Sequence, residues 1–140
     1  MITIPFPSTY GAALVRKEVT FSSTTGAVNL FTVTGDVILR IIAVCTTNCA
    51  SGGSCDGEVG ISGSTDTILA TTDVTLLADR EIWHDATPDA EIETLSVMKD
   101  FIVSDGNDII LTLSAQADSG VLMFYCFWTP LSVDGAVVAA

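Results

Sequence analysis

The 140-residue chain has the length of one domain and is 49% hydrophobic, yet none of its apolar runs reaches the ~20 residues that a membrane-spanning helix needs. Seventeen acidic residues outnumber five basic ones, for a formal net charge of −12, and the basic residues are scattered along the chain. Proteins that bind nucleic acid or anionic membranes cluster lysine and arginine, so the composition argues against both kinds of partner.

Strand-like segments dominate the first third of the chain. Valine, threonine, isoleucine and leucine are frequent there, and glycine, aspartate and asparagine lie between the apolar runs. We expect strands at residues 18–22 and 28–33, followed by a turn at Gly35 and Asp36. Residues 37–45 are almost continuously apolar, which predicts a central strand covered on both of its faces.

The middle of the chain predicts shorter elements. Residues 58–62 and 67–71 flank a Gly-Ser-Thr-Asp segment and are expected to form a hairpin. Residues 76–84 fit either a helical stripe or a strand, and we favour a loop that leads into a short strand. Alternating charged and apolar or small residues at 91–97 predict a further strand.

The last third of the chain contains the clearest strands. Residues 100–104 and 108–115 are joined by Asp-Gly-Asn, which is a strong hairpin signal. A turn at residues 118–120 leads into a strand at 121–129. Pro130 ends that strand, because proline has no amide hydrogen to donate to a neighbouring strand.

These elements amount to about eight short antiparallel strands with little helix, which predicts a single all-β domain with a β-sandwich or jelly-roll-like fold. We assign residues 1–140 to this domain, with an N-terminal arm at 1–13 and a C-terminal tail at 133–140 outside the clear strands. Such segments are either disordered or ordered only against a neighbouring molecule, and the sequence leaves both possibilities open.

Cysteines form the most informative local feature. Cys45, Cys49 and Cys55 are spaced too loosely for a structural zinc site, which usually pairs ligands two to four residues apart, twice over. An even number of cysteines favours disulfides, with Cys49 bonded to Cys55 across a Gly-Ser loop and Cys45 bonded to Cys126 if their strands are neighbours. The alternative is that Cys45 and Cys126 are buried thiols of the core.

A search for catalytic residues finds little. His84 is the sole histidine, and Asp85 or Asp79 could orient it, but the sequence has no Gly-x-Ser-x-Gly elbow to supply a nucleophile. We therefore expect His84 to lie at the surface or at the rim of a sheet. Paired carboxylates such as Asp89, Glu91 and Glu93 leave a glycosidase pair open on composition. Two of these three alternate on a predicted strand, which would place them on one solvated face, and this is the commoner meaning of such a pattern.

Cofactor and metal motifs are also missing from the sequence. No glycine-rich segment matches a phosphate loop or a dinucleotide fingerprint. Residues 105–108 resemble the start of a calcium loop but lack the later glutamate of that loop, and turn chemistry explains them. We predict a protein that is not an enzyme and that carries no cofactor and no metal.

Four segments resemble a known group of proteins. They are LFTVTGDV at 30–37, EVGISGST at 58–65, EIWHDATP at 81–88 and NDIIL at 107–111. With them, residues 18–129 resemble the small β-rich virion proteins of tailed bacteriophages that are commonly encoded among head genes. The cysteine-bearing loop at 45–55 is not part of this pattern.

The resemblance implies a head decoration, or cement, protein that binds the lattice of the major capsid protein and stabilises the head, commonly as a homotrimer. Two observations agree with this implication. No signal peptide is visible, as expected of a protein made in the host cytoplasm and released with the virion by lysis. The hydrophobicity beyond a monomer's needs would serve subunit contacts. Candidate docking residues are Ile2, Ile4 and Phe6 in the arm and Val137 and Val138 in the tail.

Two other functions stay open at this point. One is a tail, collar or fibre-associated component of the virion. The other is a carbohydrate-binding or adhesin module, which would need an exposed aromatic platform. Trp83 is the better candidate for that platform, and Trp128, within an apolar strand, is the worse one.

Overall fold

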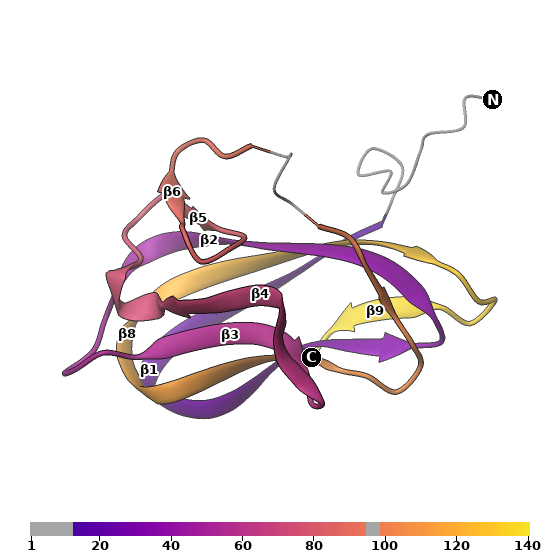
Figure 1. Ribbon diagram of the computed structural model, residues 1–140, viewed down its shortest axis with the longest axis horizontal. Helices are drawn as coiled ribbons and strands as arrows, with labels where there is room; N and C mark the ends of the chain where they lie inside the picture. The colour runs from indigo at the N-terminus through magenta and orange to yellow at the C-terminus, as the bar shows by residue number, and fades with distance from the viewer. Residues whose placement is uncertain (1–12, 95–98) are drawn as a thin grey trace.

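The computed structural model describes residues 13–94 and 99–140, which form an elongated stack of strands (Figure 1). Within these residues, strands pair antiparallel in a single curled sheet. The predicted all-β antiparallel fold is confirmed. The elements are β1 (Ala13–Thr34), β2 (Val37–Ala50), β3 (Asp56–Ile61), β4 (Ser64–Asp73), the 3₁₀ helix η1 (Val74–Leu76), β5 (Glu81–Trp83), β6 (Asp89–Ala90), β7 (Phe101–Val103), β8 (Ile109–Pro130) and β9 (Ala136–Ala139).

Two strands are much longer than the sequence suggests. The predicted strands at 18–22 and 28–33 are parts of the 22-residue β1, and those at 108–115 and 121–129 are parts of the 22-residue β8. The two long strands pair along their length, from Ala13 opposite Trp128 to Phe31 opposite Ile109. Together they form a ribbon that runs through the whole domain.

This ribbon bends so that each long strand belongs to two layers. Beyond the bend, β8 pairs with β2 over residues 119–130, whereas before it β8 pairs with β3 over residues 110–113. Backbone φ angles of 53° at Ser23, 72° at Gly26 and 122° at Gly120 accompany the bend. The turn predicted at 118–120 is therefore a bend within β8 and not a chain reversal.

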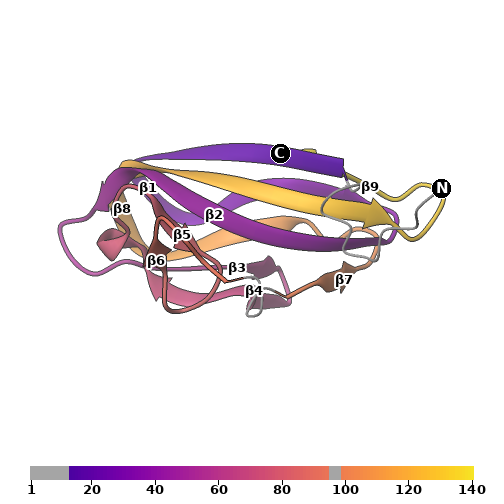
Figure 2. The same cartoon turned by 90° about the horizontal axis from the view of Figure 1, so that it is seen from above.

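The resulting sandwich has two layers, which Figure 2 shows edge-on. One layer, called the β2 layer here, contains the first half of β1, the second half of β8 and β2, with β5 and β7 paired to β2. The other contains the second half of β1, the first half of β8, β3 and β4, with β9 on the far side of β1. The core lies between the layers.

Side chains of β2 alternate strictly between the core and the outside. Val37, Leu39, Ile41, Ala43 and Cys45 are buried, and the residues between them are half-buried. The prediction that this strand is covered on both faces is therefore wrong. One face of β2 packs into the core, and its other face lies on the outside of the sandwich.

Large aromatic and aliphatic side chains fill the space between the layers. Trp83 from β5 and Phe124 from β8 meet edge to face, with ring centroids 6.2 Å apart. Phe31, Leu30 and Leu39 are fully buried beside them in the same core cluster. These side chains come from both layers, so the core holds the two layers together.

The segments around β6, β7 and β9 differ from the predictions. Within the described residues β7 pairs with β2 and not with β8, so the hairpin predicted for 100–104 and 108–115 does not form. β6 ends at Ala90, and Glu91 has a φ of 70°, so the strand predicted at 91–97 does not form in its described part, 91–94. In the tail, β9 pairs with residues 31–34 of β1. Ile2, Ile4 and Phe6 lie outside the described residues. No helix in the described part of the chain is long and apolar enough to cross a membrane.

Candidate functional site

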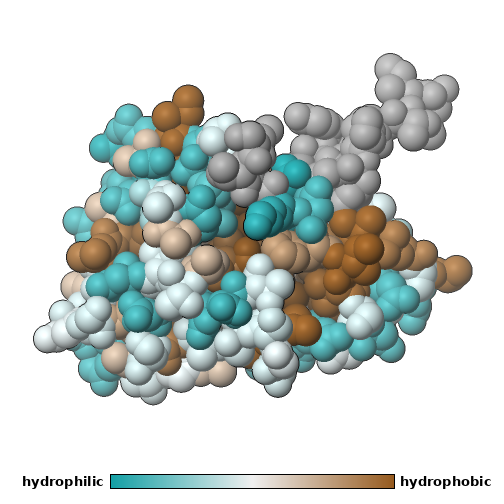
Figure 3. All heavy atoms as spheres, in the orientation of Figure 1, coloured by the Kyte–Doolittle hydropathy of each residue, from teal (hydrophilic) through white to brown (hydrophobic). Residues whose placement is uncertain are grey.

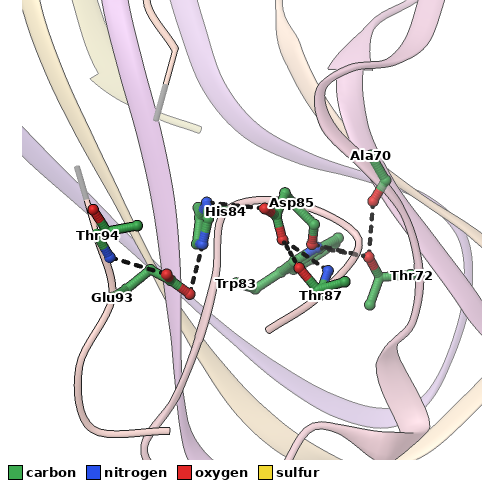
Figure 4. Close-up of polar contacts among 8 residues, drawn as sticks. All are labelled: Ala70, Thr72, Trp83, His84, Asp85, Thr87, Glu93 and Thr94. Atoms are coloured by element: carbon green, nitrogen blue, oxygen red, sulfur yellow. Dashed lines mark hydrogen bonds and ion pairs between the residues drawn. The ribbon is translucent and has the colours of Figure 1, made fainter. Parts of the chain in front are cut away.

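His84 lies in a buried polar cluster next to β5 (Figure 4). Its Nε2 atom is 2.6 Å from a carboxylate oxygen of Glu93, and its Nδ1 atom is 3.6 Å from a carboxylate oxygen of Asp85. The His84 side chain is 2% exposed and that of Glu93 is 8% exposed. The predictions of a surface or rim histidine and of a solvated Glu93 are therefore wrong, because the chain after β6 returns and covers the ring.

The electrostatics of this cluster favour an ionised Glu93. The backbone amide of Thr94 donates to the Glu93 carboxylate at 2.9 Å, and this bond, followed by the contact with His84, lowers the pKa of Glu93 below its ordinary value of 4.5. His84 lies between two carboxylates, those of Glu93 and Asp85, in Figure 4. The arrangement can anchor the segment after β6 to β5.

Trp83 points into the core and not to solvent. Its side chain is fully buried, and its Nε1 donates a hydrogen bond to Thr72 Oγ1 at 3.1 Å. Thr72 in turn donates to the carbonyl of Ala70 at 2.9 Å, with the Asp85 carbonyl at 3.3 Å. The interpretation of Trp83 as an exposed sugar-binding platform is therefore wrong. Trp128 is half-buried and packs against the core as well.

A small polar cleft of about 230 Å³ lies beside the histidine cluster. Its lining combines charged and apolar side chains: Ile41, Asp66, Thr67, Ile68, Ala70, His84, Asp85 and Lys99. In the part of the chain that the structure describes, no three His, Cys, Asp or Glu side chains lie close enough together to hold a metal ion.

All four cysteines are buried free thiols in the structure. Cys45 and Cys49 lie together, with their sulfur atoms 4.0 Å apart, whereas the thiol of Cys55 donates to the carbonyl of Ala115. Cys126 lies opposite Ile41, four residues along β2 from Cys45. Four residues of a strand span about 13 Å, so Cys45 and Cys126 are too far apart to form a disulfide.

Burial changes the acidity of these thiols. It raises the pKa of both Cys49 and Cys126 to about 12. The pKa of Cys45 is also raised, mainly by burial. Because the thiolate is the reactive form, these groups resemble core thiols more than redox-active ones.

The outside of the β2 layer carries an unusual number of apolar side chains. Directly opposite residues on neighbouring antiparallel strands point to the same side of a sheet, so the register identifies this set. We call it the outer face: Leu14, Arg16, Glu18 and Thr20 of β1, Val121, Met123, Tyr125, Phe127 and Thr129 of β8, and Ile38, Arg40, Ile42 and Val44 of β2. Leu14 is 39% exposed, and the members from β2 and β8 are half-buried.

Charge distinguishes the central part of this layer from the rest of the chain. Residues 13–22, 37–50 and 119–130 contain three of the five basic residues but one of the seventeen acidic residues, a formal charge of +2. The rest of the chain carries −14. On the outer face, Arg16 lies over the ring of Tyr125 and Arg40 pairs with Asp100 at 2.9 Å.

Figure 3 shows the opposite side of the molecule, over β3 and β4. Hydrophilic and intermediate residues cover most of it, and a hydrophobic patch lies to the right, where β7 runs in Figure 1. Ile102 of β7 is 72% exposed and lies opposite Ile38 of β2. The apolar surface of the outer face thus continues around the edge of the sheet onto β7.

The tail residues singled out in the sequence have different environments. Val137 is 3% exposed and belongs to the core, whereas Val138 is 55% exposed. The end of the tail is tied to β1, since the Ala140 amide donates to the Leu30 carbonyl and Lys17 Nζ donates to the Ala140 carbonyl. Val138 is the one of the two valines that a partner can reach while β9 stays paired.

Comparison with known proteins identifies a similar fold. No protein-family model matches the chain, and no curated protein matches it. A chain in the acid-stable capsid structure of Helicobacter pylori bacteriophage KHP30 has a similar fold, with a TM-score of 0.53 and 13% sequence identity. The similarity covers 92% of this chain and 92% of that chain. This chain therefore shares its fold with a component of a phage capsid structure.

Proposed function

We propose that this protein is a structural protein of a bacteriophage virion that decorates the outside of the head. In this role it binds the lattice of the major capsid protein and stabilises the shell, as a homotrimer made in the host cytoplasm. The observation that carries the proposal is the likeness of fold to a chain of a phage capsid structure over 92% of both chains.

Features of this chain support the proposal independently. The four resembling segments at 30–37, 58–65, 81–88 and 107–111 point to the same class of virion proteins. The acidic balance of the chain suits a protein that does not touch the packaged genome. A structural role also agrees with a buried histidine and with thiols that belong to the core.

Attachment to the capsid would use apolar residues near the chain ends. Val138 lies on β9, at the edge of its layer, and is accessible to a partner strand. Ile2, Ile4 and Phe6 are the corresponding candidates in the N-terminal arm. A tail, collar or fibre-associated position is the second candidate, because such components are also β-rich virion proteins.

Copy number separates these two positions. Quantitative mass spectrometry of purified particles would count this chain relative to the major capsid protein. A stoichiometric ratio to the capsid lattice supports the head position, and a few copies per particle moves the protein to the tail or collar. Absence from purified particles would refute a virion role.

Binding to the lattice can be tested directly with particles that lack this chain. The purified protein is expected to co-sediment with such capsids and to raise the temperature at which they open. Capsids that neither bind the protein nor gain stability from it would contradict the cement role.

A further inference from the structure

We propose that the outer face of the β2 layer is the surface through which copies of this chain bind one another. The inference rests on the proposed function, since a decoration protein acts as an oligomer on the capsid lattice. It goes beyond that function by naming the contact surface, and it can be measured on the purified chain without any capsid.

The first argument is the composition of the outer face. Eight of its thirteen residues are apolar or aromatic, and Ile102 extends the apolar surface onto β7. The part-buried side chains that pack against the core are different ones: Val15, Val28, Ile61, Phe101 and Trp128. The outer-face residues are therefore not required by the core of the single chain, and a contiguous apolar surface of this kind usually marks an interface.

The second argument is electrostatic and identifies the partner. Two molecules that each carry −12 repel one another across most of their surfaces. On the outer face, Arg16 and Arg40 are balanced by Glu18 and by Asp100, which pairs with Arg40. This face is therefore close to neutral while the rest of the chain is strongly acidic, so a second copy meets the least repulsion there. A strongly basic partner would instead be attracted to the parts of the chain that carry −14.

The third argument is the position of the cations. Arg16 over Tyr125 and Arg40 paired with Asp100 lie among the apolar side chains of the outer face. Glu18 lies two residues from Arg16 on the same side of β1, so the face offers both signs of charge. Mixed charge within an apolar patch fixes the relative orientation of two copies of the chain when their outer faces meet.

The tail lies on a different side of the sandwich from the outer face. The exposed docking candidate Val138 lies on β9, which pairs with the part of β1 that belongs to the other layer. Attachment to the capsid through the tail and contact between copies through the outer face would therefore use different sides of the sandwich.

The decisive experiment measures the mass of the purified chain by light scattering over a range of concentrations. The wild type is expected to form a defined multiple of 14.6 kDa. Ile42→Glu and Phe127→Glu place a carboxylate within the outer face and are expected to shift the mass to that of one chain. Ile92→Glu, at an 81% exposed position outside this face, is the matched control and should leave the mass unchanged.

A second pair of variants tests the role of charge while keeping the apolar surface. Arg16→Glu is expected to weaken association by about tenfold or more, because it removes a cation from the interface. Arg80→Glu changes charge equally at a side chain that is 71% exposed and pairs with Glu91, and it should have no such effect. Circular dichroism of each variant verifies that the sandwich is folded.

Three results would overturn the inference. A wild type that has the mass of one chain at every concentration excludes contact between copies. An oligomer that persists in folded Ile42→Glu and Phe127→Glu variants places the contact elsewhere. A monomeric wild type whose capsid binding is lost in Ile42→Glu would show that this face binds the capsid, which leaves the proposed function intact and rejects the second copy.

Discussion

Gly120 of β8 lies directly against Cys49 of β2. A Cβ atom built on Gly120 would lie 2.6 Å from both the Cα and the Sγ atoms of Cys49, and the φ angle of Gly120 is 122°. Both observations require glycine, because such a φ disfavours a side chain and the space for one is already filled. The contact lies where β8 bends between the layers, so it helps to set the path of the ribbon.

We expect Gly120→Ala to lower the free energy of unfolding by about 2–5 kcal/mol, through backbone strain and overpacking together. Gly26→Ala is the control, since Gly26 has a φ of 72° but no atom within 4 Å of the added Cβ. It should cost about 1–2 kcal/mol from backbone strain. Urea unfolding measures both, and equal losses would contradict the role of the Cys49 contact.

The two neighbouring valines of β9 give a second prediction. Val137 is 3% exposed, so Val137→Ala should cost about 2 kcal/mol of unfolding free energy from lost burial. Val138 is 55% exposed, and Val138→Ala should change stability by less than about 0.5 kcal/mol. Thermal unfolding measures the difference.

The same pair separates stability from attachment. Val138→Asp is expected to weaken binding to capsids without lowering the melting temperature of the free protein. Removing residues 133–140 removes the buried Val137 together with Val138, so loss of binding by that deletion would not distinguish docking from unfolding. A Val138→Asp variant that binds capsids like the wild type would exclude the tail as a docking segment.

The buried hydrogen bond of Trp83 gives a third prediction. Thr72→Val keeps the shape of the side chain but leaves the Trp83 Nε1–H without its acceptor, which should cost about 1–3 kcal/mol. Thr71→Val is the neighbouring control, since the Thr71 hydroxyl is exposed and donates to Glu58 at 3.2 Å. Urea unfolding followed by tryptophan fluorescence compares the two, and equal stabilities would show that the Trp83 bond contributes little.

Local patterns predicted most of the strands, with the exception of the one at 91–97, but not their continuity. Glycine and polar residues at 23–26 and 114–120 have the composition of turns, yet in the fold they bend β1 and β8 without reversing them. Such residues can either reverse the chain or bend a continuous strand, and the outcome depends on which strands pair with it in the two layers. Local sequence does not contain that information. The sequence also could not show that β2 is buried on one face only, because the residues on its outer face are apolar too.

The buried histidine cluster illustrates a different limit. His84 and Glu93 are nine positions apart, and their contact depends on the short β5–β6 pair and the φ of 70° at Glu91. Neither residue has a neighbour in the sequence that signals burial, so the charged character of this segment favoured a solvated interpretation. The Trp83 bond to Thr72 likewise joins two strands that the sequence pattern does not relate.

The lowered pKa of Glu93 predicts how stability depends on pH. A carboxylate whose pKa is lower in the folded than in the unfolded state stabilises the fold above its unfolded pKa, and this contribution is lost as the pH falls through the folded pKa. Glu93→Gln should therefore lower the melting temperature at pH 7. It should also reduce the loss of stability between pH 5 and more acidic conditions.

Glu91→Gln serves as the control for this pH series. Glu91 pairs with Arg80 at 3.1 Å, but both side chains are more than half exposed, so its removal should change the pH dependence little. The melting temperatures of the wild type, Glu93→Gln and Glu91→Gln, measured from pH 7 into the acidic range, test this prediction. Parallel curves for the wild type and Glu93→Gln would show that the His84 contact does not depend on an ionised Glu93.

The free thiols give the last prediction. With pKa values of about 12, Cys49 and Cys126 are almost entirely protonated at pH 8, and they are buried. The native protein should therefore react slowly with iodoacetamide, whereas the denatured protein should gain four adducts without prior reduction. A reductant should leave the melting temperature unchanged for the same reason. Fewer than four adducts under denaturing, non-reducing conditions would reveal a disulfide, and peptide mapping would then distinguish Cys49–Cys55 from a bond between the adjacent thiols of Cys45 and Cys49.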